Sequence, residues 1–278
     1  MSVMIGPGPI SKMKSSLDEQ GNVSYQLPIG DELLSLNEVI GKELKLTFHN
    51  KITCKHCDKK IRKSYSQGYC FPCMQKLAQC DMCIMKPETC HYDQGTCREP
   101  EWGEQHCMIK HYVYLSNTSG VKVGITRHTQ IPTRWVDQGA TQALPLFAVS
   151  TRLQSGLVEI ELAKHIADKT NWRAMLKGQG DAVDLKGKAQ ELLPLIAETV
   201  AELKERFGDD AIEILDEEVV DLAFPVTEYL TKISSFNFDK TPEVSGVLKG
   251  IKGQYLIFDT GVINMRKFSS YHVSAEVN

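Results

Sequence analysis

The sequence lacks the long hydrophobic runs, internal repeats and low-complexity tracts that mark membrane-spanning and fibrous proteins. Its longest apolar runs, such as residues 144–149 and 255–258, are far shorter than the roughly 20 residues that a membrane-spanning helix needs. We therefore expect no membrane partner. The 278 residues are 42% hydrophobic and 24% charged, a composition that excludes disorder, collagen and coiled coil. At about 100–200 residues per domain, this length predicts two domains, or one larger domain with small modules.

Cysteine is absent from most of the chain, because all nine cysteines lie between Cys54 and Cys107. The first residues also lack the basic and apolar regions of a secretory signal, so we expect a reducing, cytoplasmic location. In such a compartment, clustered cysteines are metal ligands more often than disulfides. Few aliphatic residues accompany them, so residues 53–110 are predicted to form a small module in which metal replaces a hydrophobic core.

The most specific motif is a pair of Cys-x-x-Cys sequences separated by twelve residues, Cys54/Cys57 and Cys70/Cys73. Four thiolates can surround one tetrahedral Zn²⁺ at sulfur–metal distances of about 2.3 Å. All four positions around the ion are then filled by protein. The spacing therefore predicts a closed, structural zinc ribbon and not a metal that activates water.

A third Cys-x-x-Cys sequence predicts a second metal site, so the expected cofactor is one or two structural Zn²⁺ ions. The expected ligands of the second site are Cys80, Cys83, Cys97 and Cys107. The competing candidates are Cys90, His91 and His111. Spacing alone does not choose among them.

Charge is distributed unevenly, although the formal net charge is only −3. Residues 42–79 contain nine basic and two acidic side chains, whereas residues 190–243 contain fourteen acidic and four basic ones. Basic side chains can neutralise phosphates while aromatic rings stack on bases, which makes nucleic acid the leading partner. The expected nucleic-acid-binding residues are Lys59, Lys60, Arg62, Lys63 and Arg127. The alternative is that the zinc module contacts protein partners.

The central part of the chain predicts the order β-β-α-β-α. Residues 111–115 and 121–126 are β-prone and flank a turn sequence, so they predict a hairpin. A short helix near residues 132–138, a strand near 144–151 and a helix from Gly156 to about Asp168 follow. Ser155 is the expected cap of that helix. Another helix is expected over about residues 190–207, with Pro194 in its first turn or kinking it.

Both ends of the chain read as β-structure. Alternating Leu44, Leu46 and Phe48 predict a strand, and residues 253–258 and 262–264 predict a strand pair joined by a tight turn. We expect the terminal segments to pair, as a small barrel. The predicted fold class is α+β, with a β-rich scaffold from the termini, a zinc-ribbon module and a small central core. The expected segments are residues 1–52, 53–110, 111–180, 181–243 (acidic and helical) and 244–278.

Two short motifs, Val113-Tyr114-Leu115 and Val121-Lys122-Val123-Gly124, resemble the two namesake motifs of the GIY-YIG nuclease superfamily. Lys122 departs from the name-giving tyrosine but approaches the Lys-x-Gly form of some branches. The resemblance implies that Tyr114, Lys122, Arg134 and Glu159 are catalytic, with Glu161 as a competing register and Asn171 as a late asparagine. The zinc ribbon, residues 95–100 and residues 250–256 are also similar to an uncharacterised bacterial family.

The resemblance implies a metal-dependent endonuclease that cleaves phosphodiesters by in-line attack of water. Tyr114 would accept the water proton, Glu159 would hold Mg²⁺ or Mn²⁺, and Arg134 would stabilise the phosphate. The alternative is a non-catalytic, zinc-dependent adaptor that binds nucleic acid or protein. A third possibility is an accessory factor of RNA modification.

Overall fold

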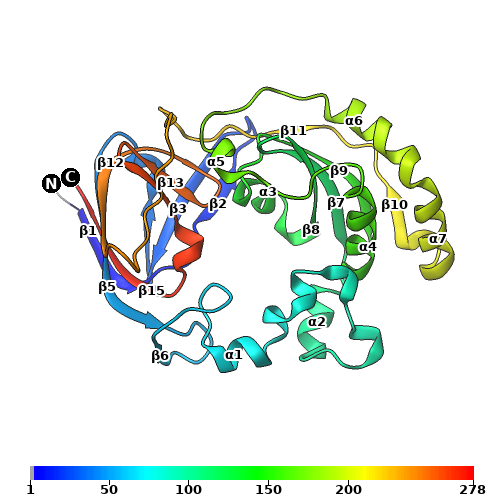
Figure 1. Ribbon diagram of the computed structural model, residues 1–278, viewed down its shortest axis with the longest axis horizontal. Coiled ribbons are helices and arrows are strands. Elements are labelled where there is room, and N and C mark those ends of the chain that lie inside the picture. The colour runs from blue at the N-terminus through cyan, green and yellow to red at the C-terminus, as the bar shows by residue number, and fades with distance from the viewer. Residues whose placement is uncertain (1–2) are drawn as a thin grey trace.

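The computed structural model describes residues 3–278, and its 30% helix and 34% strand confirm the α+β class. Figure 1 shows two β-rich halves, one built mainly from the two ends of the chain and the other from its middle. The cysteine-rich segment connects them along one side. No helix among residues 3–278 combines the length and apolarity needed to cross a membrane.

The terminal half contains a seven-stranded antiparallel sheet with the order β1-β15-β5-β12-β13-β14, and β6 pairs with β5. Its strands are β1 (Val3–Pro9), β5 (Glu43–Thr53), β6 (Lys60–Ile61), β12 (Glu243–Lys252), β13 (Tyr255–Phe258), β14 (Gly261–Asn264) and β15 (Tyr271–Val277). Val3 pairs with Val277, which confirms that the terminal segments come together. The expected turn between residues 258 and 261 is also confirmed, because Phe258 pairs with Gly261.

The terminal half is not a closed barrel, because no pairing joins β1 to β14 within the described residues. Instead, a three-stranded sheet of β2 (Lys14–Leu17), β3 (Val23–Ile29) and β4 (Glu32–Ser35) packs against the larger sheet. The alternating residues Leu44, Leu46 and Phe48 of β5 are buried between them with Tyr25 and Leu27 of β3. The two sheets bury their apolar faces against each other, so they form a core without closing into a barrel.

The central half has a second antiparallel sheet with the order β10-β9-β7-β8, and β11 also pairs with β9. Its strands are β7 (His111–Asn117), β8 (Val121–Arg127), β9 (Gln142–Val149), β10 (Ile212–Ile214) and β11 (Val220–Asp221). Its helices are α3 (Thr133–Asp137), α4 (Arg152–Leu162), α5 (Trp172–Met175), α6 (Leu185–Leu192) and α7 (Ala197–Phe207). The succession β7, β8, α3, β9, α4 is the expected β-β-α-β-α order.

The two faces of the second sheet meet different cores. Val113, Leu115 and Val123 pack with helices α4, α6 and α7, whereas Tyr114 points to the opposite face and joins the core of the terminal half. This follows from the two-residue period of a strand. The candidate site lies on the Tyr114 face.

The structure corrects two of the predicted helices. Helix α4 begins at Arg152, because Thr151 accepts a hydrogen bond from the Gln154 N–H and the Gln154 side chain accepts one from the Thr151 N–H. Ser155 is therefore inside the helix, which ends at Leu162. The helix expected over residues 190–207 is divided into α6 and α7 by a 3₁₀ turn that contains Pro194, consistent with the missing N–H of proline.

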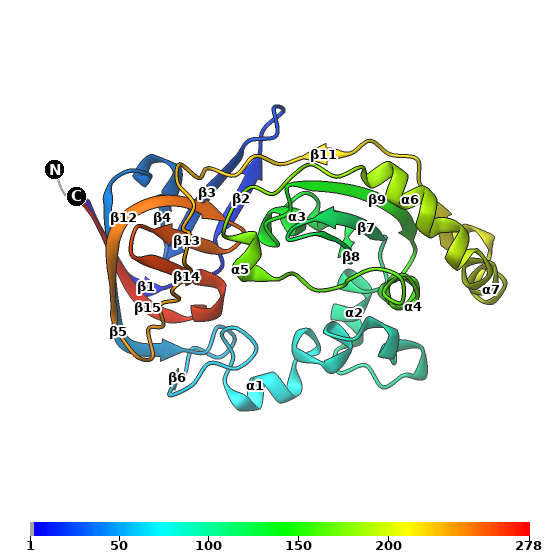
Figure 2. The same cartoon turned by 45° about the horizontal axis from the view of Figure 1, so that its top comes forward.

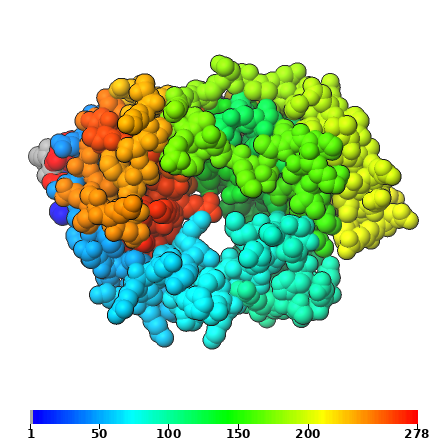
Figure 3. Space-filling model, in the orientation of Figure 1, coloured from blue at the N-terminus to red at the C-terminus, as the bar shows by residue number. Residues whose placement is uncertain are grey.

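The cysteine-rich module has little regular structure. It contains two short helices, α1 (Phe71–Lys76) and α2 (Pro100–His106), joined by 3₁₀ turns over residues 78–80, 82–84, 87–89 and 92–94. Outside this module, 3₁₀ turns lie at residues 36–39, 128–130, 193–196, 209–211 and 265–268. Figures 1 and 2 show this module running from β6 beside the terminal half to β7 in the central half. In the space-filling view, a small opening lies between the module and the two halves (Figure 3).

Candidate functional site

The first four cysteines form a compact cluster. Cys54 follows β5 and Cys57 lies in the turn that leads to β6, while Cys70 caps α1 and Cys73 lies in its first turn. The four sulfur atoms all lie within 4.8 Å of one another, as four ligands of one tetrahedral ion require. The residues present therefore fit the structural zinc ion that their spacing predicts.

Hydrogen bonds and burial shift the pKa values of two of these thiols in opposite directions. Burial raises the pKa of Cys54, but N–H donors of Cys57, Cys70 and His56 outweigh it and lower the pKa to about 6. The Cys70 sulfur together with burial raises the pKa of Cys73 to about 12. Cys54 therefore ionises readily, whereas Cys73 resists ionisation beside the other sulfurs. A divalent cation relieves this repulsion when it binds.

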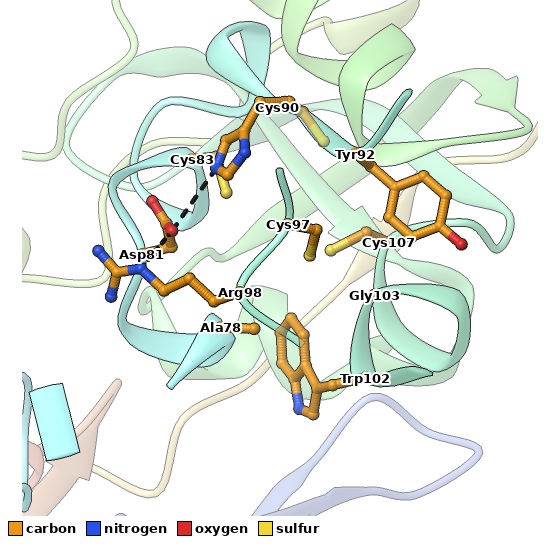
Figure 4. A pocket seen from close by; sticks show the side chains of 11 residues that line it. Ala78, Asp81, Cys83, Cys90, Tyr92, Cys97, Arg98, Trp102, Gly103 and Cys107 are labelled. Carbon is orange, nitrogen blue, oxygen red and sulfur yellow. Dashed lines mark ion pairs between the residues drawn. The ribbon is translucent and has the colours of Figure 1, made fainter. Parts of the chain in front are cut away.

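The remaining cysteines are not grouped as the sequence suggested. Cys80 packs beside the first cluster, next to Cys54 and Cys70. Cys83, Cys97 and Cys107 line a different pocket, and the fourth cysteine there is Cys90 (Figure 4). Asp81 and His91 line the same pocket, and their ligand atoms and the Cys83 sulfur all lie within 4.8 Å of one another. His111 does not line this pocket, because its Nδ1 lies 2.7 Å from the Ile109 carbonyl oxygen.

Tyr114 and Gly124 are paired across β7 and β8. The Tyr114 ring covers Gly124 so closely that a Cβ at position 124 would lie 2.8 Å from the Tyr114 hydroxyl oxygen. Tyr114 is fully buried, its ring meets Trp135 edge to face, and its hydroxyl donates to the Gln138 Oε1 atom at 3.1 Å. Burial raises its pKa to about 12 despite the positive charge of Arg134.

Three charged side chains near Tyr114 shift its pKa or the pKa values of one another. They are Lys122, Arg134 and Glu159. Lys122 is only 5% exposed on β8, and burial together with the Arg134 charge lowers its pKa to about 8. Glu159 extends from α4, where burial raises its pKa against the charges of Arg134, Arg152 and Lys122. Tyr114 in turn feels both Arg134 and Glu159. Four elements, β7, β8, α3 and α4, thus bring these four side chains into one neighbourhood.

Other residues of the resemblance are placed differently. Glu161 forms an ion pair with Lys164, so the structure brings Glu159, and not Glu161, close to Arg134 and Lys122. Asn171 caps α5 by accepting a hydrogen bond from the Ala174 N–H. Gln138, the partner of the Tyr114 hydroxyl, could not be identified from sequence, because it lies fourteen residues beyond the second motif.

The basic residues around the first cysteine cluster are exposed. Lys59, Lys60, Arg62 and Lys63 all face solvent. The Lys63 ammonium lies 5.2 Å from the centre of the Tyr65 ring, and Tyr65 meets the half-exposed Phe71 edge to face. Arg127 differs, because it is partly buried at the end of β8 and its charge acts on Cys107.

A groove of about 540 Å³ separates this segment from the terminal half. Three basic residues line it, namely Lys12, Lys55 and Arg266. Only Lys55 belongs to the basic stretch 42–79 seen in the sequence. Burial and the charge of Arg134 lower the pKa of Arg266.

No curated protein and no solved structure matches the chain. The sequence profile of a family described as "Protein of unknown function (DUF2797)" matches residues 41–273, which include the cysteine module, the second sheet and most of the C-terminal strands. The chain belongs to this family.

Proposed function

We propose that this protein binds nucleic acid through its zinc ribbon and cleaves phosphodiesters with a GIY-YIG-like site. The observation that carries the proposal is the mutual placement of Tyr114, Lys122, Arg134 and Glu159, which come from four different elements. A cluster of titratable groups with shifted pKa values is typical of catalytic sites. The exposed lysines of the ribbon and the basic groove supply the charge that a polyanion needs.

Lys122 has the properties of the group that accepts the proton of the attacking water. Its Nζ atom forms no hydrogen bond or ion pair with residues 3–278, and with its pKa lowered to about 8 a useful fraction is neutral near neutral pH. Tyr114 is less suited to this role, because burial raises its pKa to about 12, so almost none of it is ionised near neutral pH, and its hydroxyl donates to Gln138. We therefore give Lys122 the proton-accepting role that the resemblance implied for Tyr114, which becomes a positioning residue.

The proposed step can be written in full. The water oxygen forms a new bond to phosphorus as the bridging P–O bond breaks, Lys122 takes a proton from that water, and solvent protonates the leaving oxygen. The Arg134 guanidinium stabilises the negative charge on the phosphate oxygens. Glu159 is a single carboxylate, which suits Mg²⁺ or Mn²⁺ because such ions bind through one or two carboxylates plus substrate phosphates. When bound, the ion would supply Lewis-acid stabilisation of the developing charge.

The test is a cleavage and binding assay with the zinc-replete, full-length protein. Single-stranded, duplex and branched DNA and RNA are incubated with Mg²⁺ or Mn²⁺, beside the Lys122→Met and Glu159→Gln variants. We expect cutting of one substrate class that both variants lose, with binding retained. Cutting that persists in both variants would refute the site.

The second candidate function is a non-catalytic adaptor, and the complete burial of Tyr114 favours it. An adaptor would bind nucleic acid through the ribbon without cutting under any metal condition. Binding that is unchanged when the ribbon lysines are replaced would instead direct attention to a protein partner of the module.

A further inference from the structure

Four cysteines from the second half of the cysteine-rich module line one small cavity. Cys83 lies in the 3₁₀ turn 82–84, Cys90 and Cys97 follow the next two turns, and Cys107 ends α2. Figure 4 shows their four sulfur atoms around the same space. The cavity has a volume of about 10 Å³, which is room for one water-sized body. A single metal ion therefore fits there, and a larger ligand does not.

The four sulfur atoms are free to act as metal ligands. They form no disulfide and no hydrogen bond with residues 3–278, whereas three sulfurs of the first cluster form hydrogen bonds, those of Cys54, Cys57 and Cys70. Cys107 is buried, and the other three cysteines of this second set are partly buried. Four thiolates around one closed position are the donor set of a structural zinc site.

Helix α2 brings two members of the second set together. A Cβ at Gly103 would lie 3.4 Å from the Cys97 sulfur and 3.0 Å from the Tyr92 ring, so glycine at this position lets the preceding turns lie against the helix. One turn later, the Cys107 N–H donates to the Gly103 carbonyl oxygen at 2.7 Å. The close approach at Gly103 therefore places Cys97 beside the end of the helix that carries Cys107.

The second set is wider than the first. The four sulfurs of the first cluster lie within 4.8 Å of one another, but those of the second set do not form such a group within the described residues. Around one tetrahedral ion with sulfur at about 2.3 Å, the sulfurs lie about 3.8 Å apart. Each cysteine side chain turns about a single bond. We therefore expect a bound ion to draw these sulfurs inward.

A mixed group of ligands competes for the same ion but is already engaged. The ligand atoms of Asp81, Cys83 and His91 lie within 4.8 Å of one another. However, Asp81 pairs with the Arg98 Nε atom at 2.6 Å. His91 Nδ1 lies 2.8 Å from the Thr96 hydroxyl oxygen, and its Nε2 lies 3.5 Å from Asp81. An ion held by this group would have to displace the arginine, whereas an ion held by the four cysteines would not.

The second set is joined directly to the start of helix α4. The N–H of Arg152, the first residue of α4, donates to the Cys107 carbonyl oxygen at 2.8 Å, and its guanidinium donates to the Ile84 carbonyl oxygen at 2.7 Å. One cysteine of the set and the neighbour of another therefore hold the same residue. Gly156 lies so close to the turn 87–89 that a Cβ there would be 2.6 Å from a backbone nitrogen of that turn.

We propose that Cys83, Cys90, Cys97 and Cys107 bind a second structural Zn²⁺ ion, and that this ion holds the start of α4 in place. The thiols release their protons to solvent as the metal binds. Glu159 lies on the same helix, two turns after Arg152. The ion thereby positions the carboxylate of the proposed catalytic site, and this last step alone rests on the proposed function.

The experiment counts zinc ions per chain by metal analysis and native mass spectrometry of the full-length protein. Hydrogen–deuterium exchange of residues 152–162 is measured on the same samples. We expect two zinc ions in the wild type and one in both Cys90→Ser and Cys97→Ser, with faster exchange in α4. Cys80→Ser is the matched control, because Cys80 packs beside the first cluster, and it should keep two ions and slow exchange.

The first cluster provides a second control. Cys73→Ser should also lose one ion but leave the exchange of α4 unchanged, because its hydrogen-bonded link to α4 runs through the second set. A single wild-type ion that remains in Cys90→Ser would refute the second site. Two ions in Cys90→Ser and one in His91→Ala would assign the ion to the mixed group instead. Unchanged exchange of α4 in a Cys90→Ser protein that has lost one ion would refute the role of the ion in holding the helix.

The result does not depend on nuclease activity. Two zinc ions in a wild-type protein that cuts no substrate would overturn the proposed function and leave the second site standing. One ion in a protein that cuts would do the reverse. Because the count in the wild type can refute the site without any variant, a variant that fails to fold does not obscure the answer.

Discussion

The hydroxyl of Tyr114 occupies the space above Gly124, its partner across β7 and β8. Tyr114, in the first motif, therefore leaves room only for a glycine at position 124, in the second motif. Glycine is required here by this close approach, since its backbone is that of an ordinary strand. The relationship leads directly to a test.

Gly124→Ala is expected to destabilise the protein by about 1–3 kcal/mol, since overpacking a buried site costs about that much. The new Cβ would lie 2.8 Å from the Tyr114 hydroxyl oxygen and 2.9 Å from its Cζ atom, and the ring is held by Trp135 and Gln138. Denaturant unfolding measures the loss. Gly178→Ala is the matched control, because nothing approaches its Cβ position closer than 3.9 Å. Equal stability of the two variants would argue against the tight contact.

Removing one ligand of the first cluster should abolish zinc binding there and unfold the ribbon locally. The apolar core there contains only four buried residues, Cys54, Tyr69, Cys70 and Leu77, so the metal supplies the stability that a larger core would provide. Cys73→Ser is expected to release the zinc of this cluster and to expose residues 54–77 to proteases, as measured by metal analysis and limited proteolysis. His56→Ala lies in the same turn but is exposed, and it should retain zinc. An unchanged zinc content in Cys73→Ser would contradict the ligand set.

Lys122→Met should stabilise the fold and abolish cleavage together. Burial lowers the pKa of Lys122 to about 8 in the folded state, against about 10.4 in an unfolded chain. The unfolded state therefore binds more protons between these values, and stability rises with pH across that range. Below about pH 8 the folded state carries the full cost of burying the protonated amine, at most about 3 kcal/mol. Methionine removes this cost because it has no charge.

The pH dependence of cleavage gives the second readout for Lys122. Since only the neutral amine accepts a proton, the rate should rise as the pH increases through about 8. Lys252→Met is the control, because Lys252 is also buried with its pKa lowered to about 8 but donates to the Gly178 carbonyl at 2.9 Å, outside the proposed site. It should keep the pH profile of the wild type. A rate that is independent of pH in the wild type would exclude Lys122 as the base.

The ribbon lysines should control affinity for nucleic acid in a salt-dependent way. Lys59 and Lys60 are exposed, and each phosphate contact removed lowers the slope of log affinity against log salt by about 0.9 for duplex DNA. Lys59→Ala/Lys60→Ala is expected to weaken binding and reduce this slope. Lys186→Ala/Lys188→Ala on α6 is the charge-matched control, since both lysines there pair with carboxylates. Equal effects of the two pairs would mean that only net charge matters.

Local patterns predicted much of the fold. The β7–β8 hairpin, the β13–β14 turn and the first four cysteines each depend on residues that are near in sequence. The Thr151–Gln154 capping box was also visible in the sequence and would have placed the start of α4 correctly.

Long-range contacts could not be predicted from sequence in the same way. Lys122 reads as an exposed strand residue, but it is covered because Val123 donates to the Ala167 carbonyl at 2.9 Å and that segment follows the strand edge. Cys90 lines the same pocket as Cys83, Cys97 and Cys107, whereas Cys80 packs beside the first cluster. Sequence spacing does not determine which turns meet in space. Arg266 reaches the groove from the far end of the chain.

The most direct test of the account compares Glu159→Gln with Glu161→Gln, two changes of equal chemistry on one helix. Glu159 lies near Arg134 and Lys122, whereas Glu161 pairs with Lys164. Metal-dependent cleavage of the best substrate should fall at least about a hundredfold in Glu159→Gln, the scale of losing one electrostatic stabiliser of the transition state. It should stay within a few fold in Glu161→Gln. Equal activity of the two variants, or no metal-dependent cleavage by the wild type on any substrate, would contradict the proposed site.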